Sequence, residues 1–490
     1  MDDANASLDA RFQAARESAR ILADRNDFPG AERKLSFILT KAQDETARGE
    51  AKYLFGELLM LHGKHREAAE AFLKVAASYK DWREKALCQA MHAYIELGEN
   101  NKALELSESL IKEYPASESR KDALYYHAVL LEKQGKRKEA AKEFSGFAKN
   151  YPNHPLASDA LFAAANTAFD EQNYAEAEKI FSECLQNYPA GRRAPNALYK
   201  RLYTHFLRGD NETAVKDAKL LAEKYPASRF AAAGLFWLAD YYRNAKNYSK
   251  ADEILKEIAS RHKNDTENAA RALCEHAFLC RDTERPEQAL SLLDELFSKY
   301  PASNALGDGF FLRGDIMSER GEYDKAIISY QKSATLRPNS RLELNSRGRI
   351  GDCQFSLYSE TYDQSCLKAA VSEYEKVLSR KDLPNMTRQH LLYKVGRCYD
   401  LLGQEDKALS KYREVLYSHR AENEFENRKT DPAWVVKSAQ AGITMCLKRN
   451  TPESIDNASE FLRALRDLQL LPAEDYEKQI RELKEKQKLL

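Results

Sequence analysis

A tyrosine-proline pair returns along this chain at a constant interval. Successive pairs lie 37 residues apart at Tyr114-Pro115, Tyr151-Pro152, Tyr188-Pro189 and Tyr225-Pro226. Further along the chain, the corresponding positions hold His262-Lys263, Tyr300-Pro301 and Arg337-Pro338. A self-similar period between about 20 and 50 residues is the signature of an array of repeated structural units. The interval therefore decides the fold class before any local pattern is considered.

One period contains two amphipathic helices. Between residues 122 and 152, apolar residues recur at three- and four-residue steps, first at 124, 128 and 131 and again at 140, 144 and 147. This spacing places them on one helical face. Gly135 supplies the left-handed turn that ends the first helix, and Pro152 ends the second. The same glycine slot recurs at Gly63, Gly98, Gly209, Gly321 and Gly403, and a phased alanine recurs at Ala31, Ala68, Ala103, Ala140, Ala177, Ala214, Ala251, Ala289 and Ala326.

The pattern resembles the tetratricopeptide repeat, in which small residues and aromatic residues alternate at set offsets before a closing proline. The clearest match is Phe310, Gly314, Met317, Ala326, Tyr330, Ala334 and Pro338, followed by Leu392, Gly396, Tyr399, Ala408 and Tyr412. The resemblance covers roughly residues 30 to 420. It implies an all-α fold, a right-handed solenoid of stacked antiparallel helix pairs.

The closing motif is similar to that of a longer variant of the repeat. In Tyr114-Pro115-Ala116-Ser117 and Tyr225-Pro226-Ala227-Ser228 the serine is placed to cap the following helix by accepting a backbone amide. This Tyr-Pro-x-Ser form resembles the bacterial envelope repeats of the BamD-type outer-membrane assembly lipoprotein and the YbgF-type Tol-Pal coordinator. The resemblance implies a role in envelope assembly.

Along the chain we predict four segments. Residues 1–48 form an N-terminal helical pair whose second helix opens with Pro29, and residues 49–340 form the regular array. Residues 341–420 hold two divergent units, with an inner turn lengthened by about seven residues at 358–364. Residues 421–490 hold a polar linker or long turn and terminal capping helices, with apolar positions at Tyr476, Ile480 and Leu483. A turn insertion in a solenoid is a candidate contact loop or a neutral extension.

Composition excludes several functions. The charges of the 76 basic and 76 acidic side chains cancel, which argues against a protein whose main function is to bind nucleic acid. No apolar run approaches the roughly 20 residues of a membrane-spanning helix. The start of the sequence has no secretory or lipidation signal, which predicts a cytoplasmic location, with the periplasm as the alternative if the start is truncated.

No catalytic, cofactor or metal constellation is found, so we predict no enzyme, no cofactor and no metal site. The eight cysteines are spread over separate elements without a Cys-x-x-Cys motif and are interpreted as small core residues. Unpaired thiols favour a reducing compartment. Cys88 with His92, and Cys274 with Cys280, are weak alternatives for nucleophilic or redox chemistry.

In the tetratricopeptide family, set positions of the first helix face a concave groove. Carried onto this chain, they predict a partner-binding groove formed by Tyr125, Phe162, Asn166, Tyr199, Tyr203, Phe206, Phe236, Asp240, Arg243 and Phe311. Rigid aromatic rings suit a peptide or an amphipathic helix of a protein partner. Two functions follow. One is a non-catalytic interaction scaffold, and the other is a receptor or regulatory subunit that binds a glycan or another ligand by stacking.

Overall fold

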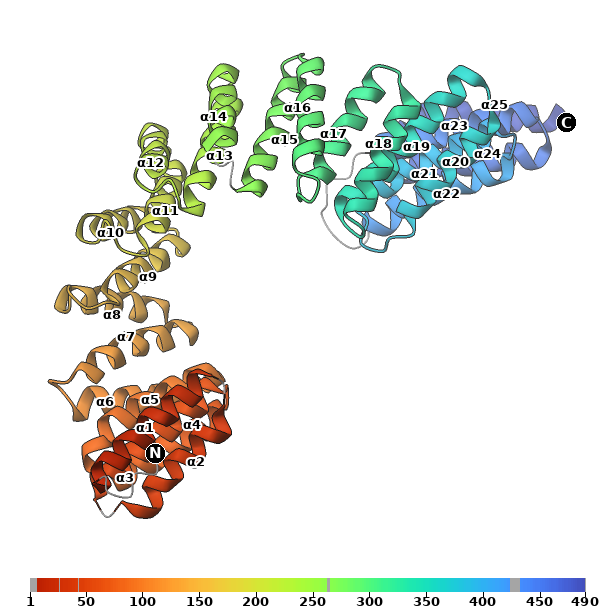
Figure 1. The fold of residues 1–490 in the computed structure, drawn as a ribbon. Coiled ribbons are helices and arrows are strands. Elements are labelled where there is room, and N and C mark those ends of the chain that lie inside the picture. The colour runs from red at the N-terminus through yellow and green to blue at the C-terminus, as the bar shows by residue number, and fades with distance from the viewer. Residues whose placement is uncertain (1–6, 26, 43, 262–264, 424–431, 490) are drawn as a thin grey trace. The chain divides into compact units, whose positions relative to one another are not determined.

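The computed structural model describes residues 7–25, 27–42, 44–261, 265–423 and 432–489, and over these ranges the chain is helical without a strand. It divides into two compact units, Met1–Trp237 and Leu238–Leu490, with the division falling inside one helix. Figure 1 shows the helices following one another in antiparallel pairs along each unit. The predicted all-α solenoid of stacked helix pairs is confirmed. The handedness of its superhelix stays a prediction.

The first unit is built from the helices α1 to α12 and a short 3-10 helix. Their bounds are α1 Leu8–Asp24, α2 Phe28–Lys41, α3 Glu45–Leu61, α4 His65–Ser78, η1 Lys80–Trp82, α5 Arg83–Leu97, α6 Asn100–Glu113, α7 Glu118–Lys133, α8 Arg137–Asn150, α9 Ala157–Asp170, α10 Tyr174–Asn187, α11 Ala194–Leu207 and α12 Asn211–Lys224. Helix α13, Arg229–Asn244, contains the division between the units.

The second unit continues with α14 to α25. Their bounds are α14 Tyr248–Arg261, α15 Thr266–Asp282, α16 Pro286–Lys299, α17 Leu306–Glu319, α18 Tyr323–Leu336, α19 Arg341–Thr361, α20 Gln364–Leu378, α21 Asn385–Leu401, α22 Glu405–Asn423, α23 Ala433–Arg449, α24 Pro452–Asp467 and α25 Ala473–Leu489. Each helix packs against the next from α1 to α12 and again from α14 to α25.

First helices of neighbouring pairs also touch each other. In the first unit α5 contacts α7 and α9 contacts α11, and in the second unit α15 contacts α17, α17 contacts α19 and α21 contacts α23. Within each unit, first helices of neighbouring pairs therefore lie side by side, and any partner-binding surface of the first helices must lie on that side of the unit.

The turn and core predictions are confirmed residue by residue. All six predicted turn glycines have φ between 70° and 82°, the region that L-residues enter only at a steric cost. The phased alanines are at most 1% exposed. Between the helices of one pair a small residue faces a ring, as at Gly56, where an added Cβ would lie 2.6 Å from Phe72, and at Gly314, where it would lie 2.6 Å from Tyr330.

The repeated Tyr-Pro pair has a structural role between repeats. The Tyr188 hydroxyl donates to the carbonyl of Pro152 over 2.9 Å, and the Tyr225 hydroxyl donates to the carbonyl of Pro189 over 2.7 Å. Each tyrosine thus forms a hydrogen bond with the closing proline of the previous repeat. The predicted serine caps are also present, because Ser117 Oγ accepts from the amide of Arg120 over 3.1 Å.

The predicted inner-turn insertion at 358–364 is wrong. The extra residues extend α19 to 21 residues, ending at Thr361, and α20 begins at Gln364. Tyr362 closes α19 in a left-handed conformation (φ 59°), and Asp363 caps α20 by accepting from the Ser365 amide over 2.8 Å. A side-chain cap at the very next residue lets the chain reverse without a loop, so the insertion lengthens a helix.

The C-terminal segment is predicted to contain a linker and a terminal capping helix. The predicted linker at 421–432 falls partly within α22, which continues to Asn423, and residues 424–431 lie outside the described residues. The final segment forms α25, where Tyr476, Ile480 and Leu483 are buried against the preceding helices. The helix and its three buried positions are therefore as predicted.

Candidate functional site

The ten predicted groove residues all lie on first helices, but they belong to two units. Seven are in the first unit: Tyr125 on α7, Phe162 and Asn166 on α9, Tyr199, Tyr203 and Phe206 on α11, and Phe236 on α13. Asp240 and Arg243 on α13 and Phe311 on α17 are in the second unit. The two sets are therefore considered separately.

The first rings of the predicted ladder are largely walls of their own helix pairs. The Tyr125 ring lies 5.6 Å from Phe144 and 5.8 Å from Phe147 of the paired helix α8. Burial raises the pKa of Tyr125 to about 12. Phe162 lies 6.0 Å from Phe181, and the guanidinium of Arg193 covers its ring at 5.3 Å. These two rings contribute mainly to the core.

Phe236 does not belong to an accessible surface, because its side chain is only 2% exposed. The reason is the composition of α13, whose segment from Ala231 to Ala239 is apolar throughout. Ala231, Ala232, Leu235, Leu238 and Ala239 are each at most 2% exposed. A helix without a polar stripe is buried on more than one face, so the Phe236 side chain points into the core.

Helices α11 and α13 bring large rings of the first unit together, including Phe230, which lies 5.5 Å from Tyr199. Tyr199 and Tyr203 lie 5.0 Å apart, with their hydroxyls 3.3 Å apart. The Trp237 ring lies 6.4 Å from Tyr203 and 5.5 Å from Phe206. We call Tyr199, Tyr203, Phe206 and Trp237 the aromatic patch. Phe206 is 41% exposed and is the most open of the predicted groove residues.

The sequence reasoning missed Trp237 as a member of this patch. It predicted the neighbouring Phe236, one position earlier on the same helix. No local pattern separated the two residues, because the segment 231–239 is apolar throughout and its alanines, at 231, 232, 233 and 239, do not lie on one face of the helix.

A buried ion pair holds α11 in place beneath the patch. Arg201 donates to Asp217 of α12 through Nε at 2.9 Å and through Nη2 at 2.6 Å, and its Nη1 donates to Ser182 of α10 over 3.2 Å. His205 Nε2 lies 3.7 Å from the same carboxylate, and burial lowers the pKa of His205. Because this bidentate contact ties three helices together, the rings above it stand on a rigid base.

The remaining predicted groove residues make contacts within their own helix or helix pair. Asn166 donates to Asp170 over 3.1 Å, and Arg243 pairs with Asp240 at 2.8 Å one turn away. Phe311 lies 5.4 Å from Tyr330 within a core cluster of the second unit. None of these residues adds to the aromatic patch.

The thiols are core residues, as interpreted from the sequence. All eight are unpaired, and every one except Cys366 is buried. Burial raises the pKa of Cys88 to about 12 and lowers the pKa of His92 on the same helix. A protonated, buried thiol is a poor nucleophile. In the part of the chain that the structure describes, no helix is long and apolar enough to cross a membrane.

Family profiles identify the repeat. The profile described as "Tetratricopeptide repeat-like domain" matches residues 186–344, and two profiles described as "Tetratricopeptide repeat" match residues 125–192 and residues 92–117 and 390–420. This chain is a tetratricopeptide repeat protein. Proteins built from these repeats are generally interaction scaffolds that bind protein partners, and the family is typically non-catalytic.

Solved structures of several repeat proteins resemble parts of this tetratricopeptide repeat chain. A repeat protein from Parabacteroides merdae is 17% identical, with 55% of this chain and 98% of that chain covered and a TM-score of 0.34. Yeast Tom70 is 11% identical, with 90% and 97% covered and a TM-score of 0.37. The APC/C hetero-tetramer Cut9-Hcn1 is 11% identical, with 96% of each chain covered and a TM-score of 0.31. No curated protein matches the sequence.

Proposed function

We propose that this protein is a non-catalytic scaffold whose aromatic patch on α11 and α13 binds a peptide or helical segment of a protein partner. The observation that carries the proposal is a set of clustered, partly open rings on a rigid base. Tyr203 and Phe206 both contact Trp237, while the Arg201–Asp217 pair fixes α11 below them. Tyrosine and tryptophan provide contact area at low entropic cost and dominate many interfaces.

Quantitative affinity capture tests this role. The full chain, a Tyr203→Ala, Phe206→Ala variant and a matched Tyr362→Ala variant are each used as bait. Tyr362 is 78% exposed and directly follows α19 in the second unit. Loss of an aromatic anchor costs at least about 2 kcal/mol, so a direct partner should fall at least tenfold with the first variant only. Equal recovery with all three baits contradicts the proposal.

The alternative, a glycan receptor, is supported by the paired hydroxyls of Tyr199 and Tyr203 beside the Trp237 ring. Rings with adjacent hydroxyls suit stacking and hydrogen bonding to a sugar. A glycan array probed with the same three proteins separates the two functions. Glycan binding that disappears in the double variant, together with unchanged protein capture, favours the receptor.

We also propose two compartments that follow from different observations. The Tyr-Pro-x-Ser motif supports a role in bacterial envelope assembly, whereas eight unpaired thiols favour the reducing cytoplasm. Fractionation of cells that produce the natural full-length protein distinguishes them. Recovery with the periplasm and capture of envelope-assembly proteins supports the envelope role, and recovery with the cytoplasm contradicts it.

A further inference from the structure

Three potential metal ligands meet between α14 and α15 of the second unit. Asp252 lies on α14, and His276 and Cys280 lie four residues apart on one face of α15. One ligand atom from each side chain lies within 4.8 Å of the other two. The His276 and Cys280 residues are buried, at 4% and 0% exposure, and Asp252 is largely covered.

The chemistry of this set selects a class of metal. A thiolate, an imidazole and a carboxylate are the ligand types of Zn²⁺, whereas Mg²⁺ and Ca²⁺ prefer oxygen ligands only. Local sequence spacing could not predict this cluster, because its ligands come from two helices and 24 residues separate Asp252 from His276.

Existing contacts of Asp252 define what an ion must displace. His276 Nε2 lies 2.7 Å from Asp252 Oδ1, shorter than the roughly 3.3 Å between two ligands in a tetrahedral zinc site. Arg285 Nη1 lies 3.5 Å from the same oxygen, and it also donates to Gln288 over 3.0 Å. Lys256 Nζ holds the other oxygen, Oδ2, at 2.6 Å. His276 Nε2 and Asp252 Oδ1 must therefore move slightly apart to admit an ion between them. Lys256 keeps the carboxylate oriented through Oδ2.

We propose that Asp252, His276 and Cys280 bind one zinc ion that joins α14 to α15, with a small exogenous ligand completing the tetrahedron. When the ion binds, the Cys280 thiol releases its proton to solvent and the thiolate sulfur coordinates the metal. Arg285 gives up its contact with Asp252 Oδ1 and keeps its hydrogen bond to Gln288. The site then holds neighbouring helix pairs together through a metal contact as well as through apolar packing.

Cobalt titration of the full chain tests the site. The protein is freed of metal with a chelator, its affinity tag is removed, and Co²⁺ is added while the near-ultraviolet spectrum is recorded. One Co²⁺ per chain should bind with a thiolate-to-cobalt charge-transfer band that Zn²⁺ abolishes by competition. Cys280→Ser should remove the band, and His276→Gln should weaken binding at least tenfold. Arg285→Gln should tighten binding several-fold, because it removes the competing cation.

Cys274→Ser is the matched control. Cys274 is a buried cysteine on the same helix, outside the three-residue cluster, so its loss should leave the band and the affinity unchanged. The wild-type spectrum decides the matter even if a variant fails to fold. Absence of a charge-transfer band in the wild type, or an equal band in Cys280→Ser, overturns the zinc site and assigns Asp252 and His276 to a hydrogen-bonded pair.

Discussion

The repeats of the first unit and those of the second build the same helix pair with different residues. In α7 and α8, Ala128 and Phe144 share one core cluster. In α17 and α18 the corresponding residues are Gly314 and Tyr330, and the Tyr330 hydroxyl donates to Asp315 over 2.6 Å. The pairing of a small residue with a ring recurs in both units, and the polar end of the tyrosine is an addition that Asp315 satisfies.

The closing contact differs in the same way. In the first unit a tyrosine hydroxyl reaches the preceding proline carbonyl, whereas in the second unit Arg337 reaches back with its guanidinium to the carbonyl of Asn304 over 2.5 Å. Either donor ties one turn to the turn before it. The comparison teaches that a repeat tolerates a changed residue when a donor of similar reach replaces it.

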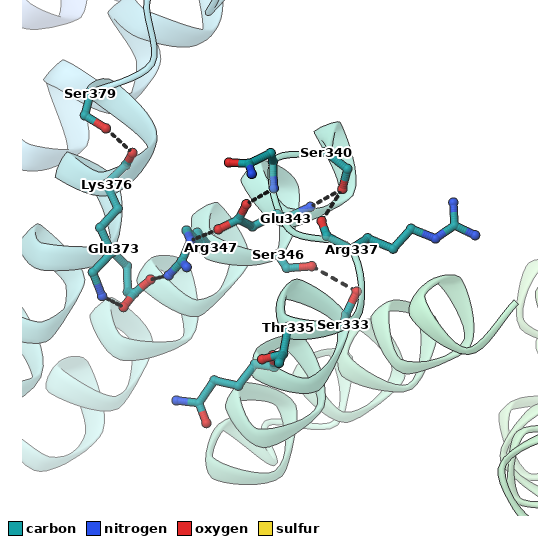
Figure 2. A network of polar contacts seen from close by, with 12 residues as sticks. Ser333, Thr335, Arg337, Ser340, Glu343, Ser346, Arg347, Glu373, Lys376 and Ser379 are labelled. Atoms are coloured by element: carbon teal, nitrogen blue, oxygen red, sulfur yellow. Dashed lines mark hydrogen bonds and ion pairs between the residues drawn. The ribbon is translucent and has the colours of Figure 1, made fainter. Parts of the chain in front are cut away.

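Figure 2 shows how the second unit reinforces its altered closure. Ser340 caps α19 by accepting from the Glu343 amide over 3.2 Å, and Glu343 accepts from Arg347 over 2.8 Å. Arg347 also pairs with Glu373 of α20 at 3.1 Å, while Ser346 donates to Ser333 of α18 over 3.1 Å. This polar network links three successive helices at the place where the tyrosine is lost.

Deleting one core ring in each unit is the strongest way to break the comparison. Phe144→Ala and Tyr330→Ala should each lower the free energy of unfolding by about 3–5 kcal/mol, because a fully buried ring leaves a cavity. Since repeats contact only their neighbours, hydrogen exchange measured by mass spectrometry should increase mainly in the altered unit. Equal increases in both units would show that they unfold as one.

Adding a methyl group to Gly314 should be the next largest effect. Its Cβ would lie 2.6 Å from the Tyr330 ring, so Gly314→Ala should destabilise the protein by about 1–3 kcal/mol in denaturant unfolding. Gly348→Ala on α19 is the matched control, because its Cβ meets no atom within 4 Å. That change should stabilise by about 0.5–1 kcal/mol through helix propensity. Similar effects of the two substitutions would contradict the close-approach explanation.

Acidification should change the contributions of two histidines, one in each unit, in opposite directions. The hydrogen bond that His127 donates to the Glu143 carboxylate raises the pKa of His127 in the first unit, so its stabilisation is full below the ordinary 6.5 and is lost as pH rises through the raised value. In the second unit burial, reinforced by Lys394 and Lys437, lowers the pKa of His390 to about 4. Its stabilisation is full above 6.5 and is lost as pH falls toward about 4.

Comparing variants isolates these contributions from other titrations. His390→Phe keeps a ring against Trp434, whose ring centroid lies 4.0 Å from that of His390. The shift corresponds to roughly 3 kcal/mol, and solvent screening of the partly exposed ring reduces the expected effect, so the variant should lessen the loss of stability between pH 6.5 and 4 by about 1 kcal/mol. His127→Gln should remove a smaller stabilisation that is present in acid. Thermal unfolding across this pH range measures both effects. An unchanged pH profile in His390→Phe would refute the assignment.

Removing a closing hydroxyl should have the smallest effect. Tyr188→Phe and Tyr225→Phe each lose one hydrogen bond to a proline carbonyl near the surface, which predicts a loss of about 0.5–1 kcal/mol. Tyr362→Phe serves as the control because that ring is 78% exposed. Denaturant unfolding should leave the control unchanged. If the three variants have the same free energy of unfolding, the Tyr-Pro pair serves only to end the helix.

Local sequence signals determined much of the fold. The 37-residue interval, the turn glycines and the phased alanines predicted helix pairs whose turns and buried positions the structure confirms. These features depend on backbone sterics and on the period of a helix, which act within a few residues. The same signals could not tell a longer turn from a longer helix at 358–364, because that outcome depended on the cap at Asp363.

Only the tertiary structure decided which side chains are accessible and which meet. Phe236 and Trp237 are adjacent in sequence, yet the first is buried and the second joins the aromatic patch. Likewise Asp252, His276 and Cys280 come together only because α14 packs against α15. A periodic sequence fixes the helix pair, but the exposure of a side chain is set by the neighbouring pair that packs over it, and that packing acts between residues distant in the chain.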